Sequence, residues 1–301
     1  MPAEAAVAQS LDLVLRLRRI PMFRGLPLDS LHALALAARV ERLAPGTPLA
    51  RAGEPWSALN VVLEGELDGP RGSDMESVTD RAQRLGALAL LAGRPLPCPV
   101  VARGPVQLLR VPPDTLFALL EEDFGALLEV LRSLAGQLLE GPVTVGGLPP
   151  RAPQAASPLD LVERMLVIWR SFGLEQVSTT ALADLARGAA QSVANGTAPL
   201  WRAGDAASEA VLVVDGAVEL RPPALPALRA GPQAVLGGLD VLASTPRRYD
   251  AIPTARTVLL HLPAGQLLSR LEDHFDMAVD VLATLSRDAV RQLCGSREVT
   301  A

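Results

Sequence analysis

The hydrophobic positions of the chain change their spacing twice. Near the start they recur three and four residues apart, so that Leu31, Leu34 and Ala38 share one face of a predicted helix beginning close to Pro27. From Val40 onward, short apolar runs are separated by glycine and proline, which is typical of short strands in a small barrel or roll. Helical spacing then returns with four leucines spaced by four, three and four residues: Leu127, Leu131, Leu134 and Leu138.

This order of elements occurs twice. Gly86 and Gly237 lie 151 residues apart, and a fixed offset over a long stretch indicates an internal duplication. We therefore expect two domains, residues 1–140 and 159–301, joined by a linker of residues 141–158 that is rich in proline and glycine. The same offset relates Arg51 to Arg202, Gly53 to Gly204, Gly65 to Gly216, Pro95 to Pro246, Pro112 to Pro263 and Phe124 to Phe275.

Two polar stretches between the strands are predicted to be hairpin loops. Residues 69–84 carry several turn formers and no apolar period, and residues 221–233 are rich in proline. Trp56, Trp169 and Trp201 are isolated along the chain, which indicates packing residues rather than platforms for stacking nucleic-acid bases.

Composition narrows the class of protein. Hydrophobic residues make up 49% of the 301 positions but aromatic ones only 3%, so the core is expected to be aliphatic. The net charge of −5 argues against a nucleic-acid surface. No apolar run reaches the ~18 residues that span a membrane. All 28 basic residues are arginine, which indicates the coding bias of a GC-rich, bacterial genome. The isolated Cys98 and Cys294 favour a reducing cytoplasm.

The segment from Leu236 to Arg247 carries the candidate chemistry. The glycine pair Gly237-Gly238 frees backbone amides, the following Leu239 opens a short helical turn, and an arginine closes the segment. Amides at a helix start and a guanidinium both bind anions, so Arg247 and its neighbour Arg248 are candidate phosphate ligands. No serine–histidine–acid set and no metal-binding spacing stands out in the sequence, so we expect neither a catalytic site nor a metal site.

Several short motifs stand at the turns and strand ends of the two halves. They are Met22-Phe23-x-Gly25-Leu26, Arg51-Ala52-Gly53-Glu54, Val62-Leu63-Glu64-Gly65-Glu66, Arg202-Ala203-Gly204-Asp205, Val214-Asp215-Gly216-Ala217-Val218 and the segments around Gly86 and Gly237. With these motifs each half resembles a cyclic-nucleotide-binding domain, the module of the bacterial catabolite activator and of the regulatory subunits of cyclic-AMP-dependent protein kinase. The resemblance implies an α+β fold of two tandem β-rolls, each flanked by N- and C-terminal helices. No DNA-binding domain is expected, because few residues follow Leu293.

The phosphate-binding cassette departs from the family pattern of Phe-Gly-Glu-x-Ala-Leu-Leu followed by Pro-Arg-Ala. In the family, the glutamate binds the ribose 2′-hydroxyl and the arginine binds the cyclic phosphate. The glutamate place falls on Ala87 in the first half and on Gly238 in the second. The arginine place falls on Leu96 and on Arg247, so the cassette around Gly86 has lost both anchors and the second keeps one.

These losses favour a non-catalytic regulatory or scaffold protein. One charge-assisted hydrogen bond contributes roughly 1.5–3 kcal/mol, so losing the ribose acceptor weakens binding about 10- to 100-fold. Ligand binding is expected to be lost in the first domain and to be weak or lost in the second, with no cofactor required. The alternative is a sensor that binds cyclic AMP, cyclic GMP or a cyclic dinucleotide through the second domain. Arg94 and, less favourably, Arg103 are the remaining cations for the first cassette.

Assembly with a protein partner or with itself is expected, because family members pair through the helix after the roll. A homodimer is slightly favoured over helices that close within one chain, since the linker is rich in proline. The first apolar seam consists of Leu127, Leu131, Leu134 and Leu138, and the second of Val279, Leu282, Val290 and Leu293.

Overall fold

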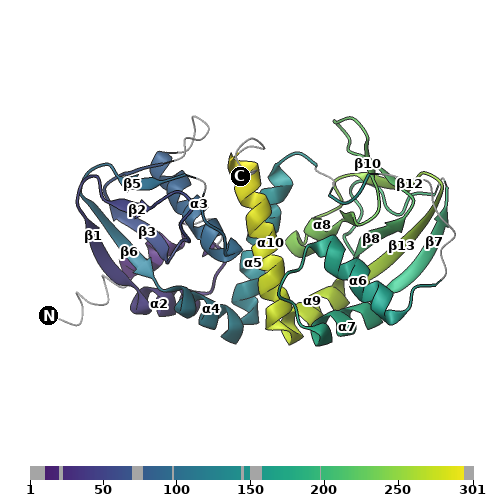
Figure 1. Cartoon of the computed structure of the whole chain (residues 1–301), viewed down its shortest axis with the longest axis horizontal. Helices are drawn as coiled ribbons and strands as arrows, with labels where there is room; N and C mark the ends of the chain where they lie inside the picture. Colours follow the sequence, from purple (N-terminus) through teal and green to yellow (C-terminus); the bar gives the residue numbers. More distant parts are fainter. Residues whose placement is uncertain are drawn as a thin grey trace. The chain divides into compact units, whose positions relative to one another are not determined.

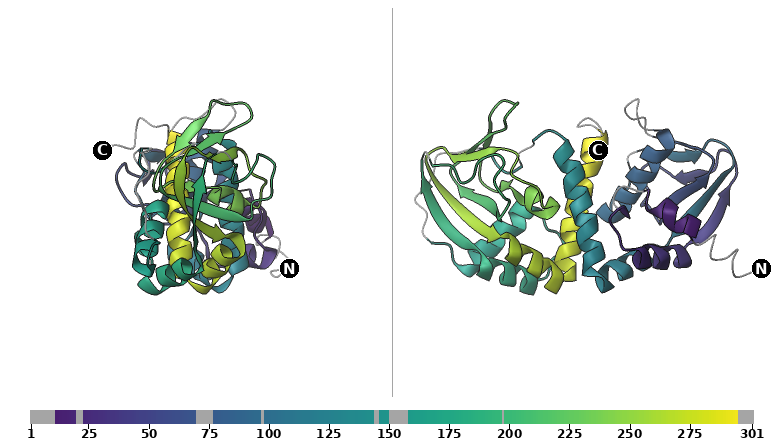
Figure 2. Two further views of the ribbon diagram at one scale, coloured as in Figure 1. Left: turned by 90° about the vertical axis from the view of Figure 1, so that its right-hand side faces the viewer. Right: turned by 180° about the vertical axis from the view of Figure 1, so that it is seen from behind.

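The computed structural model shows two compact units, residues 1–134 with 285–301 and residues 135–284 (Figure 1). In each unit antiparallel strands are flanked by helices (Figure 2), so the predicted α+β class of tandem β-rolls is confirmed. The domain limits inferred from the sequence remain a prediction. The structure describes residues 11–19, 23–69, 77–96, 98–143, 146–149, 158–196 and 198–294.

The first unit holds two three-stranded sheets. Residues 11–17 are helical and precede them. The strands of one sheet are, in spatial order, β1 (Arg39–Leu43), β6 (Val106–Val111) and β3 (Leu59–Glu64), and those of the other are β2 (Pro48–Ala50), β5 (Val100–Ala102) and β4 (Leu67–Asp68). The helices are α2 (Leu28–Ala37), α3 (Val78–Ala92), α4 (Pro113–Glu122) and α5 (Phe124–Glu140), the last of which continues into the second unit.

The second unit holds one sheet of four strands and one of three. In spatial order the larger sheet consists of β11 (Val235–Leu236), β8 (Glu209–Asp215), β13 (Arg256–Pro263) and β7 (Ala190–Asn195), and the smaller of β10 (Leu228–Ala230), β9 (Val218–Arg221) and β12 (Asp250–Pro253). The helices are α6 (Leu161–Phe172), α7 (Thr179–Gly188), α8 (Gly238–Ala243), α9 (Ala264–Asp273) and α10 (Phe275–Cys294), whose last residues belong to the first unit.

The sequence duplication is visible in the strand pairing. Arg39 pairs with Arg110 in the first unit, and Ala190 pairs with His261, each 151 positions later, in the second. The turn glycines agree as well. Gly65 and Gly216 have φ of +92° and +86°, and a Cβ on either would lie within 3 Å of a backbone carbonyl oxygen, that of Pro105 or of Arg256. Both turns therefore need glycine for conformation and for space.

The prediction of a hairpin loop over residues 69–84 is wrong, because Val78–Ala92 is the long helix α3. Ser77 caps this helix by accepting a hydrogen bond from the Asp80 amide at 3.1 Å. Leucine, alanine, arginine and glutamine fill most of its positions, and all of them favour helix. The equivalent part of the second unit contains Gly231-Pro232 and Gly237-Gly238, which interrupt a helix, and it forms short strands before α8.

The leucine seam of α5 is largely buried in a single chain. Leu127, Leu131 and Leu134 have side chains at most 1% exposed, while Leu138 is half-buried. In α10, Leu282 is buried and Val279, Val290 and Leu293 are half-buried. Within the residues that the structure describes, no helix combines the length and the apolar character needed to cross a membrane.

Candidate functional site

The cassette of the first unit does not have the geometry of an anion site. Gly86 lies in the middle of α3, so its amide belongs to a continuing helix and not to a helix start. A Cβ at Gly86 would overlap the Trp56 indole, which means that this glycine lets the helix approach the ring closely. Ala87 and Leu96 are both buried, and Arg103 is paired with Glu66 at 3.2 Å.

Leu96 is the structural counterpart of Arg247. The Gly53 amide donates a hydrogen bond to the Leu96 carbonyl at 2.9 Å, and the Gly204 amide donates to the Arg247 carbonyl at 2.8 Å. The two backbones therefore run in the same place in both units, and the sequence offset pairs the right residues. What differs is the side chain, which is apolar in one unit and cationic in the other.

Gly237 begins the cassette of the second unit. It is the N-cap of α8 with φ of +68°, a left-handed conformation that favours glycine. Its amide, which the sequence assigned to an anion, instead donates a hydrogen bond at 3.0 Å to the Tyr249 hydroxyl. Gly238 is buried in the first turn of α8, and Leu239 beside it is half-buried. The Gly237 amide is therefore already bound to Tyr249 and is not free to donate to a phosphate.

Arg247 points into its own domain. Its Nη1 donates to the Gly237 carbonyl at 3.1 Å, and its Nη2 donates to the Glu209 carbonyl at 2.5 Å. The guanidinium carbon lies 4.1 Å from the centre of the Trp201 ring, within the range of a cation–π contact. The residue is only 3% exposed, so its guanidinium is shielded from solvent.

Asp240 supplies the negative charge of the cassette. One carboxylate oxygen lies 3.9 Å from Arg247 Nη1 and the other 3.9 Å from Arg248 Nε. Burial raises the pKa of the Asp240 carboxyl, and the two arginines oppose that rise. Burial also lowers the pKa of Arg247, against the pull of Asp240. Arg248 is more exposed and donates to the carbonyls of Leu139 and Gly141.

An aromatic pair closes the cluster around Arg247. Trp201 and Tyr249 have ring centroids 6.1 Å apart, and both side chains are buried. Burial raises the pKa of the Tyr249 phenol to about 12, although the hydrogen bond from Gly237 acts in the other direction. Sequence reasoning missed Trp201 and Tyr249 as parts of the cassette, because their only signal was their rarity in an aliphatic chain. Trp56 is buried as predicted for a packing residue, whereas Trp169 is 41% exposed.

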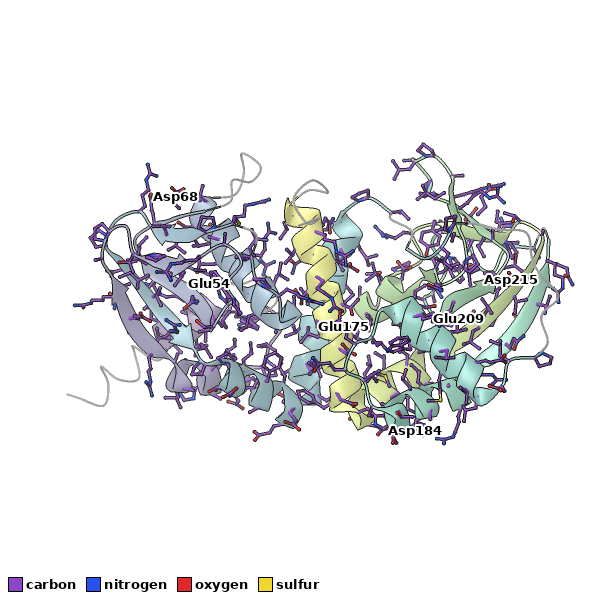
Figure 3. All side chains as sticks on the ribbon, viewed as in Figure 1. Glu54, Asp68, Glu175, Asp184, Glu209 and Asp215 are labelled. Carbon is purple, nitrogen blue, oxygen red and sulfur yellow. The ribbon has the colours of Figure 1, made fainter. Side chains whose placement is uncertain are left out.

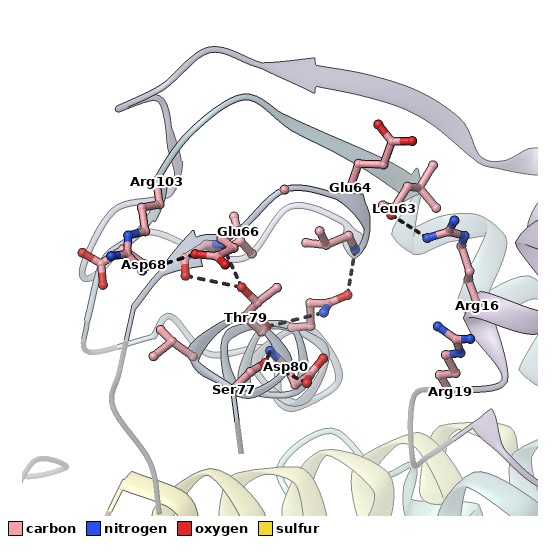
Figure 4. A pocket seen from close by; sticks show the side chains of 15 residues that line it. Arg16, Arg19, Leu63, Glu64, Glu66, Asp68, Ser77, Thr79, Asp80 and Arg103 are labelled. Carbon is pink, nitrogen blue, oxygen red and sulfur yellow. Dashed lines mark hydrogen bonds and ion pairs between the residues drawn. The ribbon is translucent and has the colours of Figure 1, made fainter. Parts of the chain in front are cut away.

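A separate hollow of about 560 Å³ lies in the first unit beside the start of α3 (Figure 4). Its walls carry charged side chains of both signs, and some of them already have hydrogen-bond partners in the wall. Arg103 pairs with Glu66, Arg16 donates to the Leu63 carbonyl, and the Ser77 hydroxyl donates to Asp80. Neither Gly86 nor Leu96 lines it, so this hollow is distinct from the degenerate cassette.

No cluster of histidine, cysteine and acidic side chains suited to a metal ion occurs among the residues placed by the structure.

Comparison with known proteins gives similarity only at the level of solved structures. No protein-family model matches the chain, and no curated protein matches it. The regulatory domain of protein kinase A from Toxoplasma gondii, crystallised with cAMP, is 18% identical with a TM-score of 0.34, over 94% of this chain and 97% of that one. The regulatory subunit of a cAMP-independent protein kinase A from Trypanosoma brucei is 15% identical with a TM-score of 0.34, over 91% and 86%.

A cyclic-nucleotide-binding-like protein from Brucella abortus is 24% identical with a TM-score of 0.33, over 36% of this chain and 97% of that one. The three proteins are of the class that the sequence motifs resemble. At identities below 25% and TM-scores below 0.5, the likeness adds no argument about ligand or activity. Only the geometry of the chain itself bears on those two questions.

Proposed function

We propose that the chain is a regulatory or scaffold protein built from two cyclic-nucleotide-binding-like domains, of which neither binds a cyclic nucleotide tightly. The observation that carries this proposal is the placement of Arg247. Its guanidinium is hydrogen-bonded to two carbonyls of its own domain, Gly237 and Glu209, and is stacked on Trp201. In the family the arginine at this position binds the phosphate of the ligand, whereas here Arg247 stabilises the cassette through contacts within its own domain.

A ligand phosphate would have to replace these internal contacts. Giving up two charge-assisted hydrogen bonds costs about 3–6 kcal/mol, which corresponds to a loss of roughly 10²- to 10⁴-fold in affinity. The buried Asp240 carboxylate, 3.9 Å from Arg247, would in addition repel a phosphate placed beside that cation. Gly238 offers no carboxylate to the ribose hydroxyl. In the first unit Leu96 offers no cation at all.

A role without a nucleotide requires a protein partner, and the surface offers apolar side chains for one. On α6, Val162, Leu166 and Trp169 are 62%, 43% and 41% exposed, and their spacing places them on one helix face. The first unit exposes Leu11 and Leu15 at the positions that correspond to Val162 and Leu166. Contiguous exposed apolar residues of this kind support protein contacts.

Calorimetry with cyclic AMP, cyclic GMP and cyclic di-GMP at millimolar concentration tests the proposal. We expect no saturable heat with any of the three ligands. Saturable binding with a Kd below ~100 μM would overturn it and favour a sensor that acts through the second domain.

Two variants then locate any binding that is seen. If the second cassette is the site, Arg247→Ala abolishes the signal and Leu96→Ala leaves it unchanged. Equal loss in both variants places the binding elsewhere in the chain. Circular dichroism of each variant shows whether the fold is retained.

A further inference from the structure

Three polar side chains form a hydrogen-bonded row across neighbouring strands of the four-stranded sheet. The Ser192 hydroxyl on β7 lies 2.7 Å from Nε2 of His261 on β13. Nδ1 of the same imidazole lies 3.0 Å from the carboxylate of Glu209, the first residue of β8, which is labelled in Figure 3. Since residues 192, 209 and 261 are far apart in sequence, no local motif could indicate this row.

The row fixes the proton positions. A carboxylate can only accept at Nδ1, so Nδ1 of His261 carries a proton, and in the neutral imidazole Nε2 then accepts from the Ser192 hydroxyl. The hydrogen bond from His261 is the main reason why the pKa of Glu209 is lowered, with burial opposing it and the charge of Arg247 assisting. Glu209 is therefore held in the ionised form, which orients the imidazole.

We propose that Ser192 is a nucleophile that is acylated by activated carboxylic esters. A serine, a histidine and a carboxylate in this order are the arrangement that makes a serine hydroxyl nucleophilic. In the step, Oγ bonds to the carbonyl carbon and its proton moves to Nε2 of His261. The ester C–O bond breaks and its oxygen leaves with that electron pair as an alkoxide or phenolate. His261 then gives its extra proton to an alkoxide, or to solvent where a phenolate leaves, and the acyl group stays on Ser192.

Ser192 can be reached from solvent. β7 is an edge strand in the order β11-β8-β13-β7, Ser192 is half-buried, and the side chains of His261 and Glu209 are 20% and 29% exposed. General-base catalysis alone contributes about 10²- to 10⁴-fold, so we expect slow acylation of one site. Acylation of Ser192 does not require either cassette to bind a nucleotide, because none of the three side chains belongs to a cassette.

The test uses the full chain and p-nitrophenyl acetate. We expect a burst of p-nitrophenolate that approaches one equivalent per chain, with the acetyl group located on Ser192 by mass spectrometry of peptides. Ser192→Ala should remove the burst. His261→Gln should slow it about 10²- to 10⁴-fold, and Glu209→Gln, which can still accept a hydrogen bond, about 10-fold or more.

Ser208→Ala is the matched control, because Ser208 is an exposed serine directly before Glu209 and should not affect the burst. The proposal is overturned if wild type and Ser192→Ala react at the same rate, or if peptide mapping of the wild type finds acetyl groups elsewhere and none on Ser192. The mapping needs no variant, so it decides the question even where a substitution impairs folding.

Discussion

Arg247 is a buried cation whose partners all lie in its own domain. Replacing it with alanine removes the side-chain donor to the Glu209 carbonyl and one of the donors to the Gly237 carbonyl, which still accepts from the Val241 amide at 3.1 Å. It also removes one of the two arginines that lie 3.9 Å from buried Asp240. We expect Arg247→Ala to lower the free energy of unfolding by about 3–5 kcal/mol, measured in urea. Arg202→Ala, which removes an exposed arginine from the same unit, should change it by less than about 0.5 kcal/mol. Similar losses in the two variants would contradict the role given to Arg247.

Glu209 makes the second unit sensitive to acid. Its lowered pKa means that the folded state binds this proton less readily than the unfolded chain does. The His261–Glu209 pair therefore adds stability above the ordinary carboxyl pKa, and this contribution disappears as the pH falls through the lower, folded-state value. We expect Glu209→Gln to cost about 1 kcal/mol near neutral pH and to cost less in acid, because the wild type then loses its charge as well. Urea unfolding over a pH series measures the difference, and an equal cost at every pH would contradict the expectation.

At the scale of the elements, helix α3 packs closely against the Trp56 ring because Gly86 has no side chain. Gly86→Ala improves helix propensity, yet the added Cβ would overlap the buried Trp56 ring. We expect the cost of overpacking to exceed the gain in helix propensity, so that the free energy of unfolding falls by about 1–2 kcal/mol. Gly136→Ala in α5 is the matched substitution, since a Cβ there meets no other atom within 4 Å. It should stabilise by about 0.5–1 kcal/mol. Urea unfolding measures both changes. A loss of stability in Gly86→Ala and a gain in Gly136→Ala support the packing argument, and a gain in both variants would contradict it.

The same element shows where sequence reasoning reached its limit. The fixed offset of 151 residues correctly paired the turns and strands of the two units, because glycine at positive φ and alternating burial leave clear signals. The loop prediction failed from Val78 onward, where polar residues suggested a loop and the local preference of leucine and alanine for helix prevailed. In the cassette, the sequence proposed Arg247 as a phosphate ligand, and that role stays a prediction; the direction of its side chain depends on Trp201 and Glu209, which only the fold brings near.

At the scale of the whole molecule, the leucines of α5 distinguish two modes of assembly. Leu131 is fully buried in a single chain, so Leu131→Arg should destabilise the fold by several kcal/mol, seen as a lower urea midpoint. If instead α5 is the seam of the homodimer predicted from the sequence, the variant stays folded and only its mass changes. Light scattering after size exclusion would then show a concentration-independent mass near 31.6 kDa for the variant and a larger one for the wild type.

Tyr249 gives the second cassette an optical signal of its own. It is the only tyrosine in the chain, so any phenolate absorbance reports on this one hydroxyl. With a pKa of about 12, the phenol stays protonated in the folded protein between pH ~10 and ~12, where an unfolded chain would already have ionised it. An alkaline ultraviolet titration should therefore stay flat beyond the ordinary tyrosine range and then rise steeply as the cassette opens. Any ligand that takes the Gly237 amide away from Tyr249 would shift that rise, so binding at this site can be followed without a label.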